Sequence, residues 1–126
     1  MQMPEPDPKV LARKAELVTG LRAIVPGEGV IDAPAELRPY ECDGLTAYRQ
    51  APLAVVLPST TDETSRVLAY CHAQGVKITP RGAGTSLSGG ALPAADAVLL
   101  GFGKMNRILE IDYENGCVVV LSLIHI

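Results

Sequence analysis

The feature that most constrains the fold is a pair of short apolar runs that flank a helical pattern within residues 53–79. The first run, LAVVL at 53–57, is an unbroken apolar segment of the kind found in fully buried strands, and Pro58 ends it. The second run, at 76–79, predicts another strand. A strand, a helix and a strand with short connections make a βαβ unit, so we predict that the two strands are parallel and joined by a right-handed crossover.

The helix between these strands has recognisable start and stop signals. Thr60 and Glu63 have the spacing of a capping box, in which each side chain accepts a hydrogen bond from a backbone amide of the first turn. Gly75 suits the left-handed conformation that commonly ends a helix. One face of the helix is predicted to carry Thr64, Val67, Leu68 and Cys71. Cys71 is interpreted as a small apolar core residue rather than a nucleophile, because it takes a buried position on the helix.

Residues 80–90, PRGAGTSLSGG, follow the second strand directly and are rich in glycine. They therefore lie at the carboxyl end of a parallel strand, which is the sheet edge where ligands bind in open α/β folds. Glycines allow successive backbone amides to converge on one point and form a nest for an anion. Arg81 adds a fixed positive charge, and hydroxyl donors come from Thr85, Ser86 and Ser88. This chemistry suits a phosphate or a diphosphate.

Three kinds of phosphate loop, and one interpretation without a ligand, compete for this segment. The dinucleotide fingerprint needs a helix that begins within the glycines, and the following LSGGALP cannot propagate one. The nucleoside-triphosphatase loop needs a Gly-Lys-Ser/Thr ending, which is absent from the sequence. A cradle of loop amides and hydroxyls fits best, although the pattern alone also allows a glycine-rich connection that binds nothing.

The residues before the βαβ unit are predicted to contain one helix and an irregular segment. Apolar residues recur at intervals of three and four over 9–24, which is typical of an amphipathic helix, and Pro26 ends the pattern. No period is visible over 25–52. The Asp43–Gly44 pair within it is interpreted as a tight turn rather than as a group that approaches a ligand.

The residues after the glycines predict a change from parallel to antiparallel pairing. A third buried strand is expected over 97–102. The segments 108–113 and 117–120 have the pattern of a hairpin, and Asn115–Gly116 predicts a type I′ turn between them.

Composition excludes several classes of function. The 11 basic and 14 acidic residues give a net charge of -3 and are interspersed, so no basic stripe is present to bind nucleic acid. The 3 cysteines lack metal-ligand spacing and are interpreted as reduced thiols without a zinc site. The first residues do not have the pattern of a signal peptide, and no apolar run is long enough to span a bilayer. We therefore expect a cytoplasmic protein with at most a peripheral association with membranes.

The remaining titratable residues are interpreted without a catalytic role. His72 is expected on the solvated face of the central helix, and His125 is assigned no role. Glu110 and Asp112 share one face of a predicted strand, where solvent-facing carboxylates are ordinary. No acid–base pair emerges, and the catalytic residues stay unknown.

Three segments, YECDGLTAYRQAPLAVVLP, PRGAGTSLSGGALP and MNRILEIDYENG, carry a family resemblance. Over residues 24–120 the sequence resembles the N-terminal half of the FAD-binding domain in the vanillyl-alcohol-oxidase family of PCMH-type flavoproteins, and within it the flavoprotein subunits of glycolate oxidases. The resemblance implies an α+β fold in which a small parallel βαβ subdomain is followed by the start of an antiparallel subdomain.

The resemblance also implies a cofactor, a substrate class and a partner. The cofactor is FAD, whose diphosphate would be wrapped mostly by backbone amides, and the implied binding residues are Pro58, Arg81, Gly82, Ala83, Gly84, Thr85, Ser86, Gly89 and Gly90. In such enzymes the flavin takes a hydride from the hydroxyl-bearing carbon of a small 2-hydroxy acid, such as glycolate or D-lactate. The implied partner is an iron–sulfur subunit of the same complex.

Three segments of the chain are expected from this resemblance. Residues 1–50 form an N-terminal helix and an irregular lead-in, and residues 51–120 form a partial FAD-binding domain. Residues 121–126, LSLIHI, depart from the family pattern, which would continue into a strand and a turn such as Gln-Pro-Gly-Val. We expect a truncated or foreign tail there, so the chain is interpreted as a fragment of an oxidoreductase. A non-catalytic fragment that binds phosphate or nucleotide is the alternative.

Overall fold

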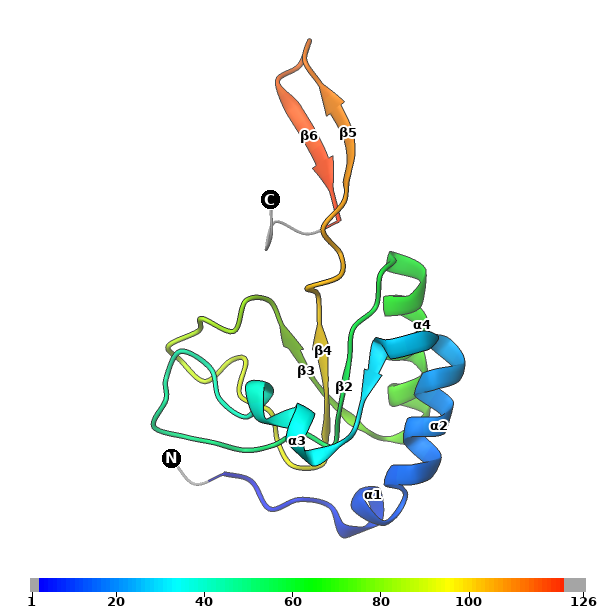
Figure 1. The fold of residues 1–126 in the computed structure, drawn as a ribbon, viewed down its shortest axis with the longest axis vertical. Coiled ribbons are helices and arrows are strands. Elements are labelled where there is room, and N and C mark those ends of the chain that lie inside the picture. Colours follow the sequence, from blue (N-terminus) through cyan, green and yellow to red (C-terminus); the bar gives the residue numbers. More distant parts are fainter. Residues whose placement is uncertain (1–2, 122–126) are drawn as a thin grey trace.

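The computed structural model describes residues 3–121 and contains two separate sheets (Figure 1). The four-stranded sheet has the order β1-β2-β4-β3, and the two-stranded sheet pairs β5 with β6. The strands are β1 (Val30–Ile31), β2 (Ala54–Val56), β3 (Lys77–Arg81), β4 (Ala97–Gly101), β5 (Ile108–Asp112) and β6 (Cys117–Val120). The helices are α1 (Pro8–Ala12), α2 (Lys14–Ile24), α3 (Pro34–Leu37) and α4 (Thr61–Gln74), with 3₁₀ turns η1 (Gly27–Gly29) and η2 (Arg38–Tyr40).

The predicted α+β class, with a parallel part followed by an antiparallel part, is confirmed. Strand β4 lies between β2 and β3 and is parallel to both, with Leu99 opposite Val55 on one side and Thr79 on the other. Every residue of β2 and β4 is buried, as expected for strands covered on both faces. The two strands of the βαβ unit are therefore parallel as predicted, but they are not neighbours. The pairing of β1 with β2 is antiparallel and was not predicted, because two residues are too few to show a period.

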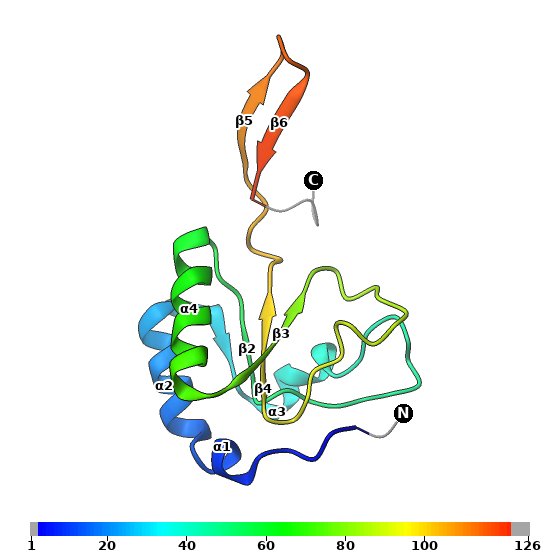
Figure 2. The same ribbon diagram turned by 180° about the vertical axis from the view of Figure 1, so that it is seen from behind.

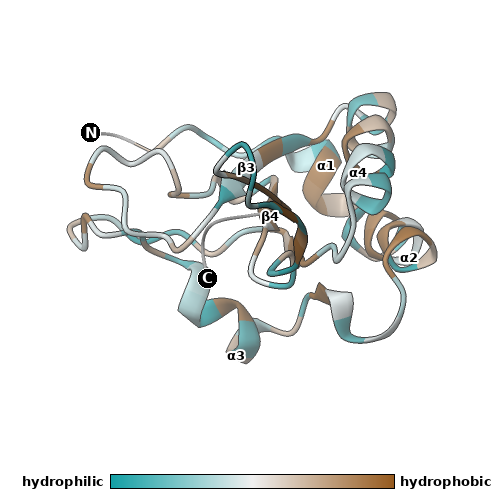
Figure 3. Cartoon of the chain, turned by 90° about the horizontal axis from the view of Figure 1, so that it is seen from above, coloured by the Kyte–Doolittle hydropathy of each residue, from teal (hydrophilic) through white to brown (hydrophobic). Residues whose placement is uncertain are grey.

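The larger sheet is covered on both faces. Helices α2 and α4 lie side by side on one face (Figures 1 and 2), where Leu17, Val67 and Val98 belong to one continuous core. A smaller core, which includes Val55 and Leu99, lies on the opposite face against α3. Seen from above, the apolar residues of β4 lie between these two layers (Figure 3). Alternate residues of the central strand thus point into different cores, as the pleat of a strand requires.

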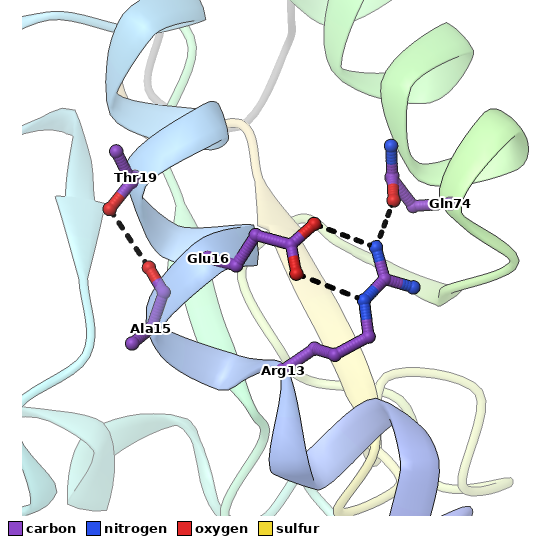
Figure 4. Close-up of polar contacts among 5 residues, drawn as sticks. All are labelled: Arg13, Ala15, Glu16, Thr19 and Gln74. Carbon is purple, nitrogen blue, oxygen red and sulfur yellow. Dashed lines mark hydrogen bonds and ion pairs between the residues drawn. The ribbon is translucent and has the colours of Figure 1, made fainter.

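The predicted helix over 9–24 is two helices, which meet at Arg13. The spacing of apolar residues shows which face of a helix is buried but not whether its backbone hydrogen bonds are continuous, so the sequence does not show the break at Arg13. The Arg13 guanidinium lies 3.0 Å from a carboxylate oxygen of Glu16 and also donates to the side chain of Gln74 on α4 (Figure 4). The hydrogen bond from Arg13 lowers the pKa of Glu16. Arg13 therefore links the two N-terminal helices to α4.

Helix α4 confirms its predicted end and corrects its capping box. The Thr60 hydroxyl accepts from the Glu63 amide at 3.1 Å, as predicted, whereas the Glu63 carboxylate accepts from the amide of Ser59 at 2.6 Å rather than from that of Thr60. Gly75 ends the helix with a φ of +67°. The predicted packing face was wrong for Leu68, which is 45% exposed. The buried face of α4 is centred on Val67 and Cys71, because these two side chains pack against α2 and the sheet in one core.

The β5–β6 hairpin projects away from the larger sheet (Figure 1), and its turn differs from the prediction. Gly116 has a φ of +65°, but Asn115 has no positive φ, so the turn is not type I′. The Asp112 carboxylate accepts hydrogen bonds from the amides of Glu114 and Asn115 at 3.0 Å. These bonds form a turn through the aspartate side chain in place of the tighter type I′ backbone turn. Glu110 is solvent exposed, in agreement with the sequence analysis.

Two further predictions concern the ends of the chain and the membrane. Of the expected tail 121–126, only Leu121 is described, and its amide donates to the carbonyl of Arg107 at 3.1 Å; His125 lies outside the described residues. Among the helices of residues 3–121, none has the length and apolar character needed to cross a membrane.

Candidate functional site

The glycine-rich segment begins where β3 ends and runs over residues 82–96 to the start of β4 without a helix or a strand. A connection of this length without regular structure is uncommon in a compact domain and is usually functional. A pocket of about 330 Å³ opens at the edge of the sheet where the loop begins. Its walls follow the carboxyl ends of three parallel strands: Leu57 after β2, Arg81, Gly82 and Ala83 at the end of β3, and Gly101, Gly103 and Lys104 at the end of β4.

The backbone amides at the start of the loop, residues 82–86, have no acceptor among the described residues. In residues 3–121, no carbonyl or side chain accepts a hydrogen bond from the amides of 82–86. Backbone amides are strong donors that proteins almost always pair or leave to solvent and ligands. Five consecutive free donors at the ligand edge of a sheet therefore fit an anion with several oxygens, as a diphosphate has.

Gly84 and Arg81 are packed against each other inside this loop. Gly84 has a φ of +75°, a conformation that residues with a Cβ rarely adopt. A Cβ on Gly84 would also overlap the Arg81 guanidinium. The Arg81 side chain therefore folds back beneath its own loop, and glycine is required above it.

A second segment, Tyr40–Gly44, braces the loop from the side. The Arg81 guanidinium donates to the carbonyl of Cys42 at 2.6 Å and lies over the Tyr40 ring, 5.8 Å from its centroid. A Cβ on Gly44 would lie 2.8 Å from the carbonyl oxygen of Thr85, so glycine allows the two backbones to approach. We call Tyr40–Gly44 the bracing segment.

Asp43 confirms the predicted turn and adds a feature that the sequence did not show. One carboxylate oxygen, Oδ1, accepts from the amide of Leu45 at 2.9 Å, which is the expected aspartate turn. The side chain is only 4% exposed, and its Oδ2 atom has no hydrogen-bond partner among residues 3–121. The hydrogen bond from the Leu45 amide to Oδ1 holds the turn that carries Cys42 and Gly44 to the loop.

The structure brings some of the predicted site residues together and leaves others apart. Arg81, Gly82 and Ala83 line the pocket, and Gly84 continues the same loop. The Thr85 side chain is exposed, and the Ser86 hydroxyl accepts from the amide of Ser88 at 3.3 Å. Gly89 and Gly90 lie further along, where the Gly89 carbonyl accepts from the amide of Leu92. Pro58 is fully buried behind the edge and does not line the pocket.

Sequence reasoning missed two groups of the pocket wall, Lys104 and Tyr40. Lys104 follows the buried β4 in the stretch GFGK, and glycines that follow a buried parallel strand are the signal that could have placed it at the same edge. Tyr40 could not be assigned because its contact with Arg81 joins residues that are far apart in the sequence.

A larger cavity of about 540 Å³ adjoins the pocket and shares Leu57 and Lys104 with it. Its wall also contains Arg22, which is paired with Asp32 at 2.7 Å. Lys104 forms no ion pair among residues 3–121. The smaller pocket contains no carboxylate, so Arg81 and Lys104 make its wall cationic at neutral pH.

The residues that the sequence analysis set aside lie away from this edge. Cys71 is buried between α4 and the sheet, and desolvation raises the pKa of its thiol to about 11. A neutral buried thiol is a core residue and not a nucleophile. His72 is exposed near the end of α4, as expected.

A loop with free amides, at the carboxyl edge of a small parallel sheet and beside a cationic pocket, defines a nucleotide-phosphate-binding domain of the α+β class. The chain belongs to the FAD binding domain family, whose model matches residues 52–122. The matched range contains β2, α4, the glycine-rich loop and the hairpin. FAD, the cofactor inferred from the sequence, is thereby confirmed as the cofactor of the family, and the free amides of 82–86 fit its diphosphate.

The relatives of this chain include glycolate oxidase subunits and a D-2-hydroxyglutarate dehydrogenase. The chain is 46% identical over 99 residues to glycolate oxidase subunit GlcD of Escherichia coli (strain K12), a match that covers 79% of this chain and 20% of the relative. The corresponding subunit of Bacillus subtilis (strain 168) is 44% identical over 88 residues, or 70% of this chain and 19% of the relative. Mitochondrial D-2-hydroxyglutarate dehydrogenase of Bos taurus is 32% identical over 102 residues, or 81% and 19%. The chain thus spans about a fifth of the length of these relatives.

Solved structures share the fold. Alkyldihydroxyacetonephosphate synthase superposes with a TM-score of 0.72 at 22% identity and covers 96% of this chain and 24% of its own. p-Cresol methylhydroxylase with substrate bound superposes with a TM-score of 0.67 at 22% identity, over 87% of this chain and 22% of its own. These similarities confirm the PCMH-type fold inferred from the sequence.

Proposed function

We propose that the chain is the FAD-binding part of an enzyme that oxidises a small 2-hydroxy acid, glycolate or D-lactate, to the 2-oxo acid. The observation that carries the proposal is the row of free amides at 82–86, at the carboxyl edge of the parallel strands. The names of the relatives, glycolate oxidase and D-2-hydroxyglutarate dehydrogenase, support the substrate class.

The residues of the loop would divide the binding of FAD between them. Residues 81–86 would hold the diphosphate, mostly through backbone amides, and Gly89 and Gly90 would allow the cofactor to approach the backbone closely. Pro58 would support the edge from the buried side. When bound, FAD supplies the acceptor for the hydride from the hydroxyl-bearing carbon of the substrate.

The assembly, the location and the division of the chain belong to the same proposal. The relative named as a subunit supports a protein that works in a complex, and we propose an iron–sulfur subunit as the partner. We propose a cytoplasmic location, and a division into a lead-in over 1–50 and a partial FAD-binding domain over 51–120. In the described residues the lead-in and the sheet share one core, since Leu17 of α2 packs in the same cluster as Val98 of β4.

A chimera tests the enzyme proposal. The 99-residue segment of E. coli GlcD that matches this chain is replaced by this chain's own residues. We expect the chimera to retain FAD, with a visible flavin spectrum that glycolate bleaches, and we expect Gly84→Val in the same chimera to lose the flavin. A Gly84→Val chimera that keeps its flavin would show that the loop does not hold the cofactor.

A second function, binding of a nucleotide without catalysis, is favoured by one observation. The pocket offers free amides and a cationic wall for a diphosphate, whereas its described wall contains no carboxylate or histidine to move a proton. Titration of the 126-residue chain with ADP and with FMN, which lacks the diphosphate, tests the binding itself. Binding of ADP with no flavin retention in the chimera would favour this second function over the enzyme.

A further inference from the structure

The carboxyl edge of the parallel sheet has two cations, and their surroundings differ. The Arg81 side chain contacts other residues of the protein, whereas Lys104 forms no ion pair or side-chain hydrogen bond with the residues that the structure describes. Both line the pocket at the start of the glycine-rich loop. A cation that contacts a ligand strengthens binding through its charge, whereas a cation that packs within the protein affects binding only through the shape of the loop.

Three contacts commit the Arg81 side chain to the protein. Its guanidinium donates to the carbonyl of Cys42 at 2.6 Å and lies over the ring of Tyr40. It also fills the space beneath Gly84, where a Cβ would overlap it. A planar guanidinium can stack and donate in its own plane at the same time, which an ammonium cannot do. Arg81 thus joins the bracing segment to the loop whose amides are free.

Lys104 has the opposite character. It lines both cavities at this edge, on the β4 side, and it has no ion pair among residues 3–121. In the larger cavity Arg22 is paired with Asp32, and the two carboxylates of its wall, Glu28 and Glu36, form no ion pair with Lys104 among residues 3–121. Lys104 is therefore the cation of the pocket whose charge and donors are available to a ligand.

We propose that these two cations have separate tasks: Lys104 binds the cofactor diphosphate directly, and Arg81 is a positioning residue that fastens the bracing segment to the glycine-rich loop. The inference rests on the proposed function, because it assumes that the loop holds a diphosphate. It assigns a binding role to a lysine that follows β4. It also makes Tyr40, Cys42 and Gly44, which lie outside the glycine-rich motif, part of the cofactor site.

Binding of ADP to the full chain by calorimetry, at about 0.05 and about 0.5 M NaCl, separates the two tasks, because salt screens an exposed ion contact far more than a packing contact. We expect Lys104→Gln to weaken ADP binding about tenfold at low salt and much less at high salt, and Lys104→Arg to restore it. Lys9→Gln, on the exposed side of α1, is the matched control and should leave the affinity unchanged.

The bracing role predicts a different pattern. Arg81→Lys should weaken ADP binding as much as Arg81→Gln, at both salt concentrations, because the charge alone does not reproduce the stacking and the bond to Cys42. Tyr40→Leu should weaken it less, because it removes only the ring contact, and the double variant Tyr40→Leu/Arg81→Gln should be no worse than Arg81→Gln alone, since Arg81→Gln already removes that contact. Circular dichroism identifies any variant that fails to fold, and Arg81→Lys and Tyr40→Leu probe the brace independently.

Each contrary result has a distinct meaning. If Arg81→Lys binds like the wild type while Arg81→Gln loses affinity only at low salt, Arg81 acts by charge on the ligand and the positioning role is wrong. If Lys104→Gln binds normally, the assignment of Lys104 is wrong although the cradle stands. If the wild-type chain binds no ADP at either salt concentration, the proposed diphosphate cradle itself fails, and this inference fails with it.

Discussion

Replacing Gly84 by alanine tests whether the Arg81 guanidinium supports the glycine-rich loop from beneath. Gly84 and Gly89 have nearly the same backbone conformation, with φ values of +75° and +76°. Their surroundings differ, because a Cβ on Gly84 would overlap the Arg81 guanidinium, whereas a Cβ on Gly89 would meet nothing within 4 Å. Gly89→Ala is therefore a matched control for the backbone strain alone.

The expected magnitudes follow from these two environments. A left-handed conformation costs a residue with a Cβ about 1–2 kcal/mol, so Gly89→Ala should lower the free energy of unfolding by about that amount. Gly84→Ala should add the loss of the Arg81 hydrogen bond to Cys42 and of the contact with Tyr40, about 1–2 kcal/mol more. In a chain of this size each kcal/mol corresponds to a shift in Tm of about 4 °C.

Urea and thermal unfolding of the full chain, followed by circular dichroism, measure both differences. In an Arg81→Ala background the extra cost at Gly84 should disappear, so the two glycine variants should then lose equal stability. Equal losses for Gly84→Ala and Gly89→Ala in the wild-type background would refute the reasoning, because they would show that the guanidinium is not seated under Gly84.

Two further predictions concern the acid and thiol chemistry of the chain. Burial opposes the ionisation of Asp96, but the ammonium of Lys77, at 2.7 Å, and the amide of Asp7 outweigh it and lower the pKa of Asp96 below its ordinary value. Since the pKa of Asp96 is lower in the folded state, its carboxylate stabilises the fold at neutral pH, and this contribution is lost as the pH falls through the folded pKa. Unfolding by urea from about pH 7 to about pH 2 should show a smaller loss of unfolding free energy for Asp96→Asn than for the exposed control Glu5→Gln. Equal losses in the two variants would contradict this prediction. Because burial raises the pKa of Cys71 to about 11, iodoacetamide should label the exposed Cys117 first and reach Cys71 only in urea, as peptide mass spectrometry can check; early labelling of Cys71 in the native chain would mean that the α4 core is open.

Local patterns predicted the elements whose signals lie within a few residues. The start of α4 at Thr60, its end at Gly75 and the burial of β2 and β4 each depend on short-range chemistry that the sequence shows directly. The glycine-rich loop could be placed at the ligand edge for the same reason, because the residues of β3 themselves predict the strand that precedes the loop. The pocket residues Arg81, Gly82 and Ala83 follow from that placement.

The order of the strands and the brace of the site depend on contacts between distant residues. The residues of β4 do not indicate that this strand lies between β2 and β3, because a buried apolar strand can pair with any neighbouring strand. The turn at Asp43 was predicted, but the contacts of its neighbours Cys42 and Gly44 with the loop were not, since they join two irregular segments. At the hairpin, the Asp112 carboxylate accepts hydrogen bonds from the amides of Glu114 and Asn115, so the backbone turn predicted from the Asn-Gly pair does not form.

The central place of β4 also bears on how the protein is made. Strand β3 pairs with β4 within the described sheet, and β4 is encoded after the glycine-rich loop. On a translating ribosome the loop therefore emerges before the strand that completes the edge behind it, and β3 stays unpaired until residues 97–101 have left the exit tunnel. The glycine-rich loop is therefore synthesised before the strand that supports it, and a pause in translation at this point would expose the loop and the open edge of β3 to proteases and to other nascent chains.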